Sequence, residues 1–218
     1  MKKITFSLDF ISPYAYLAFE QLPQALQGLS YSVDYQPVLF AGLLKQHGQL
    51  GPAEIAPKRE WTYRHVAWLA HTHGIPVQIP AVHPFNPLAL LRLALACGPE
   101  GASPGLVPGT VNRHVAETVF RHVWRGGADA SDAVRLAALK QALNPRRDPG
   151  SQAVKDQLKA NTEAAIARGL FGVPTLAVDD KLFWGFDALP MLRAQLEGDA
   201  WFGATWDQAA SVTEGLRR

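Results

Sequence analysis

Alternating apolar and polar residues mark four strands in this chain. From Ile4 to Phe10 an apolar side chain recurs at every second position, and similar short segments follow later in the chain. The last two of them flank Asp179-Asp180, a pair that suits a two-residue hairpin turn. The pattern predicts strands over residues 4–10, 31–37, 175–178 and 181–184.

The segments between these strands have the apolar spacing of helices, and caps, prolines and glycines mark their ends. Ser12-Pro13 begins the first helix, because serine caps helices and proline suits the first helical position. Pro23 is expected to break or bend it. Ser131 and Ser151 are expected to cap two of the later helices. Further helices are predicted over residues 39–47, 57–73, 86–98, 111–124, 131–143 and 151–168, with a last one from 187 or 189 to 196.

The order of these elements predicts an interrupted α/β fold. A strand–helix–strand start implies two parallel strands, and the terminal hairpin completes a mixed sheet. Because sheet segments occur at both ends of the chain, the helical block between them is interpreted as an insertion. We expect residues 1–38 and 170–218 to form the sheet domain and residues 39–169 the inserted helical domain. Residues 49–56 are expected to be a loop and 98–109 an exposed connector.

Composition and charge exclude several classes of protein. The net charge is +2 and no long basic run occurs, which argues against nucleic acid as a partner. No stretch of 18 apolar residues is present, so no membrane span is expected. The N-terminus begins directly as a strand, and Cys97 is the single cysteine, which rules out an internal disulfide and suits a reducing compartment. We therefore expect a cytoplasmic protein.

The histidines of one predicted helix and the single cysteine are not considered candidates for chemistry. His65, His71 and His73 lie close in sequence, but two residues apart on a helix point in different directions, so no metal site is predicted. Cys97 ends an apolar helix and is expected to be a buried apolar filler. The aromatic residues of the tail from Trp201 onward are expected to pack on the body or on a partner subunit.

Three motifs are candidates for a site. They are Ser12-Pro13-Tyr14-Ala15, Gly172-Val173-Pro174-Thr175 and Trp184-Gly185-Phe186-Asp187. They lie far apart in sequence, but the predicted topology brings them to one edge of the sheet, where α/β folds usually bind ligands.

These motifs lie within longer strings that resemble a known family. Residues 6–18, 161–175 and 183–187 look like the corresponding segments of 2-hydroxychromene-2-carboxylate isomerases, and Pro57-Lys58 and Pro84-Phe85-Asn86 resemble weaker landmarks. With kappa-class glutathione transferases, these enzymes belong to the DsbA branch of the thioredoxin superfamily. The resemblance covers the chain to about Leu196. It implies a thioredoxin-like α/β fold with a large helical insertion, glutathione as cofactor, a small-molecule substrate of aromatic catabolism and a homodimer.

Ser12 is the candidate catalytic residue. Redox relatives carry Cys-x-x-Cys at the start of the first helix, whose N-terminus stabilises a thiolate. Ser12 and Ala15 occupy those two positions here. Ser12 can donate its hydroxyl proton to a thiolate but cannot form a disulfide, so the site suits a thiolate brought by a ligand, which the resemblance names as glutathione. The alternative is that Ser12 only caps the helix.

The other two motifs are candidates for binding the cofactor. The resemblance implies a cis Val173-Pro174 bond that leaves the Val173 N–H and C=O free to pair with a peptide-like ligand. It also implies that Asp187 holds the α-amino group of glutathione, although Asp187 could instead cap the following helix. Trp184 is interpreted either as a wall of this site or as a core residue.

Candidate substrate-binding residues are Tyr14, Gln49, Lys58 and Phe85. The chain departs from the family pattern at three places. Gln49 stands where an Asn is common, Leu44 where a Lys often occurs and Ala188 where an Arg is common, which puts the pocket for an aromatic carboxylate in doubt.

Three activities remain open at this stage. The leading hypothesis is a glutathione-dependent isomerase, in which the thiolate adds to an aromatic keto acid and leaves after a bond has rotated; a glutathione transferase would use the same site. A dithiol oxidoreductase would need the cysteine pair that is absent here. A thiol- or peptide-binding module without turnover is the third alternative.

Overall fold

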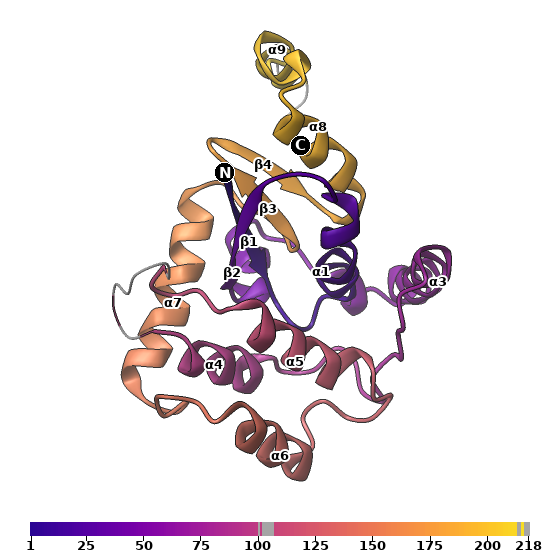
Figure 1. Ribbon diagram of the computed structural model, residues 1–218. Coiled ribbons are helices and arrows are strands. Elements are labelled where there is room, and N and C mark those ends of the chain that lie inside the picture. The colour runs from indigo at the N-terminus through magenta and orange to yellow at the C-terminus, as the bar shows by residue number, and fades with distance from the viewer. Residues whose placement is uncertain (100, 102–106, 213–214, 216–218) are drawn as a thin grey trace.

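Four strands form one mixed sheet in the computed structural model, which describes residues 1–99, 101, 107–212 and 215 (Figure 1). The strands are β1 (Lys2–Leu8), β2 (Tyr31–Pro37), β3 (Thr175–Val178) and β4 (Lys181–Trp184), in the order β2-β1-β3-β4. β1 pairs in parallel with β2 and antiparallel with β3, and β3 and β4 form the predicted hairpin. The expected mixed sheet is thereby confirmed.

Helices follow the predicted order along the chain. Their bounds are α1 (Pro13–Ala25), α2 (Phe40–Gln46), α3 (Ala56–His73), α4 (Leu88–Cys97), α5 (Arg113–Trp124), α6 (Ala133–Leu143), α7 (Gln152–Ala167), α8 (Leu189–Glu197) and α9 (Ala204–Ala210). Three short 3-10 turns are η1 (Pro52–Glu54), η2 (Phe186–Ala188) and η3 (Ala200–Phe202). None of the helices in the described part of the chain has the length and apolar character needed to span a membrane.

Several local expectations were wrong. α1 is not broken at Pro23 but continues to Ala25, because a proline near the end of a helix removes one hydrogen bond while few residues remain to be distorted. Asp132 rather than Ser131 caps α6, accepting a hydrogen bond from the Arg135 N–H. The first strand ends at Leu8 instead of Phe10, because the chain turns there and the Ser12 N–H bonds the Asp9 carbonyl.

The loop expected over residues 49–56 contains η1. The expected connector over residues 98–109 lies in large part outside the described residues.

The core is continuous from the sheet into the helical block. Phe120 of α5 packs on Phe10, Tyr16 and Phe19, with ring centroids 4.9, 6.0 and 5.2 Å apart. All four side chains are fully buried, and Figure 1 places α1 between the sheet and α5. α1 therefore buries one face against each part of the chain, whereas the division into a sheet domain and an inserted domain stays a prediction.

The tail packs on the body of the molecule. Phe202 is buried and its ring lies 5.8 Å from that of Phe183 on β4, and the Trp206 ring lies at the same distance from Phe183. Of the two expected roles for these aromatic residues, the structure supports packing on the chain's own sheet.

Asn161 joins three segments on the side of the sheet covered by α7. Its amide donates hydrogen bonds to the carbonyls of Pro37 at 2.9 Å and Gly109 at 2.7 Å, and its oxygen accepts one from Gln157. Gly109 has a φ of 79°, and a Cβ there would collide with the Asn161 oxygen. The first residue of the family-like string 161–175 thus holds the end of β2 in place.

We predict that Asn161→Ala lowers the free energy of unfolding by about 2–5 kcal/mol, because two buried carbonyls lose their donor. Urea unfolding of the variant measures this loss. The control is Lys159→Ala on the same helix, which removes only an exposed ion pair with Glu163 and should change stability by less than about 1 kcal/mol. Equal stability of the two variants would contradict the role assigned to Asn161.

Candidate active site

Ser12 lies at the N-terminus of α1, directly opposite Val173. Its Oγ accepts a hydrogen bond from the Ala15 N–H at 3.2 Å, which confirms the predicted helix cap. The same hydroxyl donates to the Val173 carbonyl at 3.3 Å, a long bond that joins the first motif to the second. Ser12 is 7% exposed, so its hydroxyl lies just beneath the surface.

The turn that delivers Ser12 is held from one side by Asp9. The fully buried Asp9 carboxyl group accepts hydrogen bonds from the N–H groups of Ile11 at 3.2 Å and Phe40 at 2.9 Å. Burial raises the pKa of Asp9 to about 7, although backbone N–H groups around the carboxylate act in the opposite direction. The carboxylate links the end of β1 to the start of α2.

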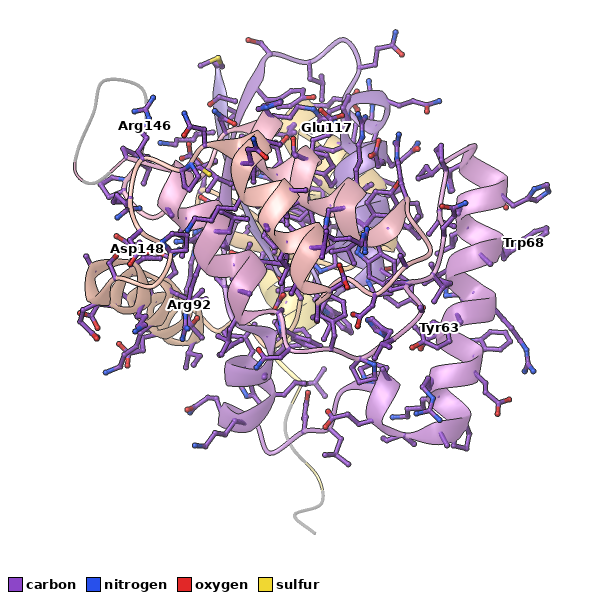
Figure 2. The ribbon with its side chains drawn as sticks, turned by 90° about the horizontal axis from the view of Figure 1, so that it is seen from below. Tyr63, Trp68, Arg92, Glu117, Arg146 and Asp148 are labelled. Atoms are coloured by element: carbon purple, nitrogen blue, oxygen red, sulfur yellow. The ribbon has the colours of Figure 1, made fainter. Side chains whose placement is uncertain are left out.

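Two ring systems hold the same turn from the other side. The Trp124 N–H donates to the Phe10 carbonyl at 2.9 Å, and Nε2 of His83 lies 2.8 Å from the Ile11 carbonyl. Since that carbonyl only accepts, Nε2 carries the proton and Nδ1 accepts from the Tyr63 hydroxyl at 2.7 Å. Burial lowers the pKa of His83, which keeps the ring neutral. Figure 2 shows Tyr63 on the inner side of α3, whereas Trp68 points outward.

Val173-Pro174 has the predicted cis bond, but one of its polar groups is already used. The Val173 carbonyl, expected to be free, accepts from Ser12, because the hydroxyl needs an acceptor at this buried position. Within the described residues the Val173 N–H donates to no group, and the Pro174 carbonyl accepts from the Gly185 N–H at 2.9 Å. One backbone donor therefore remains available beside Ser12.

Trp184 forms a wall of the site and is not part of the core. Its side chain is 53% exposed, and its ring packs at 4.8 Å from that of Phe171. The indole lies so close to Gly172 that a Cβ at that position would approach its nitrogen to 2.5 Å. The glycine of the second motif is thus needed for Trp184 to lie flat against the chain.

Asp187 faces solvent without a partner in the described chain. Its carboxylate takes part in no hydrogen bond or ion pair there, and α8 begins without a side-chain cap. Asp187 therefore does not cap α8, which was the alternative role expected for it. Gly185, with a φ of 100°, precedes it, and a Cβ at Gly185 would collide with the Asp187 carboxylate.

A cleft of about 850 Å³ gathers most of the predicted residues. Its lining comprises Tyr14, Gln21, Ala25, His65, Leu69, His73, Val173, Pro174, Trp184, Gly185, Phe186, Asp187, Leu189, Pro190 and Arg193. Ser12 itself is not part of the lining but lies behind its neighbours Tyr14 and Val173. The three sequence motifs thus meet at one cleft, as the topology predicted.

Three predicted substrate residues lie outside this cleft. Gln49 follows α2 and is exposed, Lys58 is exposed near the start of α3, and Phe85 is half-buried with its ring 5.9 Å from that of His83. Their role in substrate binding stays a prediction.

Sequence reasoning missed the wall that α3 contributes. His65, Leu69 and His73 line the cleft, and their spacing of four residues puts them on one face of the helix. The signal was present, but the histidines were weighed only as metal ligands. Among the described residues, no group of three or more His, Cys, Asp or Glu side chains is placed to hold a metal ion.

Comparison with known proteins assigns the family. The model of the DSBA-like thioredoxin domain matches residues 3–197, so the chain belongs to that family. A 2-hydroxychromene-2-carboxylate isomerase of Pseudomonas putida is 30% identical over 202 residues, which cover 88% of this chain and 93% of the relative. Glutathione S-transferase kappa 1 of Homo sapiens is 27% identical over 207 residues, covering 89% and 90%.

A solved structure supports the same placement. The chain superimposes on a 2-hydroxychromene-2-carboxylate isomerase with a TM-score of 0.74 and 25% identity, over 97% of this chain and 100% of that one. Within the DSBA-like family the chain is therefore a member of the enzyme group that contains these isomerases and kappa-class glutathione transferases. The fold predicted from the sequence, thioredoxin-like with inserted helices, is confirmed.

We predict that Asp9 makes stability fall as pH rises from 5 to 7. The folded state keeps a proton on Asp9 up to about pH 7, whereas the unfolded chain loses it near 3.8, so stability decreases by about 1.4 kcal/mol per pH unit between these values. Asp9→Asn does not titrate and should gain about 2–3 kcal/mol relative to the unaltered protein over this interval.

Denaturant unfolding at both pH values measures the difference. Other titrating groups, including His83, are common to both proteins and cancel. Asp207→Asn on α9, an exposed site, serves as control and should show no such change. A difference between Asp9→Asn and the unaltered protein that is independent of pH would show that Asp9 is ionised in the folded state at pH 5.

Proposed function

We propose that this protein is a glutathione-dependent isomerase of 2-hydroxychromene-2-carboxylate-like aromatic keto acids. The observation that carries the proposal is the position of Ser12: a hydroxyl without a neighbouring thiol, at the N-terminus of α1, facing Val173 at the back of a large cleft. The isomerases of the same family supply the substrate class.

The residues present fit glutathione, which when bound would supply a thiolate. Glutathione is a short peptide with an ammonium group at its γ-glutamyl end. The unpartnered Val173 N–H suits a peptide carbonyl, and the unpartnered Asp187 carboxylate suits the ammonium group. Both line the same cleft, which supports one extended ligand that contacts both.

Ser12 and the first turn of α1 would stabilise negative charge on sulfur. The Ser12 Oγ already accepts from Ala15, so its single proton is free to turn from the Val173 carbonyl toward a thiolate. Pro13 has no N–H, and the Tyr14 N–H has no partner among the described residues. Together with the helix dipole, these donors favour the ionised thiol.

Two other activities are weighed against this one. Dithiol exchange needs two cysteines at positions 12 and 15, and these are Ser and Ala. A glutathione transferase is the second candidate, because the kappa-class relatives match the chain over nearly the same length as the isomerases do. The homodimer and the place in aromatic catabolism stay predictions from the family resemblance, and the cytoplasmic location stays a prediction from the sequence composition.

We predict that Ser12→Ala raises the pKa of the bound glutathione thiol by about 1–2, because a hydrogen bond to a charged group contributes about 1.5–3 kcal/mol. Ultraviolet absorbance of the thiolate across pH measures this change, and turnover of a hydroxychromene carboxylate should slow in parallel.

Ser151→Ala is the matched control for Ser12→Ala. Ser151 caps α7 in the same way, accepting from the Val154 N–H, but lies outside the cleft. It should lose about 1 kcal/mol of stability, as should Ser12→Ala, while leaving the thiol unchanged. If the thiol titrates alike in both variants, the role proposed for Ser12 is wrong.

We predict that Asp187→Asn weakens glutathione binding about ten- to hundredfold, because a charge-assisted bond to the ammonium group is lost. Calorimetric titration with glutathione gives the dissociation constant. Asp156→Asn, at an exposed position of α7, is the control and should bind as the unaltered protein does. Equal affinity for glutathione and for its analogue without the α-amino group would contradict the contact proposed for Asp187.

A further inference from the structure

Tyr14 and His65 form a hydrogen-bonded pair across the cleft. The Tyr14 hydroxyl comes from α1 and lies 2.9 Å from Nδ1 of His65 on α3. Both residues line the cleft, and both side chains are half-buried. Trp61, one helical turn earlier on α3, stacks on the His65 ring at 6.1 Å with 13° between the planes. The imidazole is therefore held in one orientation at the rim of the cleft.

The pair contrasts with the other ring hydrogen bonds of the structure. His83 bonds the Tyr63 hydroxyl and, through Nε2, the backbone of the Ser12 turn. His47 and His122 bond the carbonyls of Leu170 and Ala130, so each of these three rings bonds a backbone carbonyl and serves the fold. In the described chain His65 has one hydrogen-bond partner, the Tyr14 hydroxyl. Burial, and then the negative charge of Asp187, raise the pKa of Tyr14, which keeps the phenol protonated near neutral pH.

We infer that Tyr14 and His65 together transfer a proton between oxygen atoms of the substrate. The inference rests on the proposed function, because it takes its substrate class from there. Carbon 2 of a 2-hydroxychromene-2-carboxylate carries a hydroxyl, a carboxylate and the ring oxygen, which makes it a cyclic hemiketal. Its isomerisation to an open keto acid requires a proton to leave one oxygen and reach another.

The step balances within the pair and the substrate. The hydroxyl on carbon 2 gives its proton to the Tyr14 oxygen while the Tyr14 proton passes to Nδ1 of His65. The carbonyl at carbon 2 forms, and the bond from carbon 2 to the ring oxygen breaks with its electron pair on that oxygen. The proton then returns from His65 through Tyr14 to the phenolate. Both side chains end as they began, and no further reactant is needed.

Other charged and titratable groups face the same space. His73 on α3 packs edge-on against Phe186, and Asp187 lies on η2. Arg193 on α8 donates to the carbonyls of Ala25 and Gln27 and pairs with Glu197. Arg193 is therefore committed to the fold, whereas His65 is the ring that shares a hydrogen bond with a second titratable side chain in the cleft.

His65→Gln tests the pair through a reaction that needs no glutathione. The readout is the absorbance of the phenol group that forms when the hemiketal opens. The unaltered protein should accelerate this opening, and the variant should open the hemiketal about 100-fold more slowly, which is within the usual range of a general acid–base contribution. Tyr14→Phe should show the same slower opening.

His71→Gln is the matched control. His71 lies on α3, is exposed and does not line the cleft, so this variant should open the hemiketal at the unaltered rate. Glutathione affinity and the pKa of the bound thiol, measured in parallel, should be the same in His65→Gln and the unaltered protein.

The outcomes separate the inference from the proposed function. Equal opening rates in His65→Gln, His71→Gln and the unaltered protein would overturn the role of the pair, whatever glutathione does. A second outcome is that the unaltered protein opens the hemiketal in a way that depends on His65, but converts the product no further when glutathione is added. This outcome would support the role of the pair and overturn the proposed glutathione-dependent isomerase. If the unaltered protein does not accelerate opening, the assignment of the pair is overturned.

Discussion

The hydrogen bonds around residues 9–12 are the constraint on which the site depends. The buried carboxyl group of Asp9 joins this turn to the start of α2. The indole N–H of Trp124 and the imidazole N–H of His83, from distant parts of the chain, each bond one carbonyl of the turn. Because the turn has no freedom left, the Ser12 hydroxyl is delivered to the end of α1 beside Val173. Buried polar groups of this kind are costly unless paired, so the pairing also selects one arrangement of the fold.

Pairing separates structural polar groups from those that are available to a ligand. Asp9 and Asn161 are buried and hydrogen-bonded to the backbone, and burial raises the pKa of Asp9 to about 7. Asp187 and the Val173 N–H lie at the cleft and have no partner in the described chain. Unpaired donors and acceptors at a concave surface are the groups a ligand can use, which is why the proposed glutathione contacts fall on them.

The cleft has two chemically different walls. One is built by α1, Val173-Pro174, the end of β4 and η2. It presents the Val173 N–H and the Asp187 carboxylate, and the Ser12 hydroxyl lies behind it, bonded to the Val173 carbonyl. The other is one face of α3, which carries two histidines and a leucine at intervals of four residues. A thiol ligand on the first wall and an aromatic acid against the second would meet between Ser12 and His65, where charge stabilisation and proton transfer are both within reach.

The sequence by itself determined the strands, most helix ends, the family and the three motifs, because short-range periodicity, caps and turn residues are local properties. It also implied that Ser12, Val173 and Asp187 share a sheet edge, since topology follows from element order. Only the tertiary structure decided that the Ser12 hydroxyl bonds the Val173 carbonyl, that Trp184 lines the cleft instead of the core and that His65 bonds the Tyr14 hydroxyl. The two hydrogen bonds join residues 161 and 51 positions apart, and they are set by side-chain packing, which local sequence patterns do not reveal.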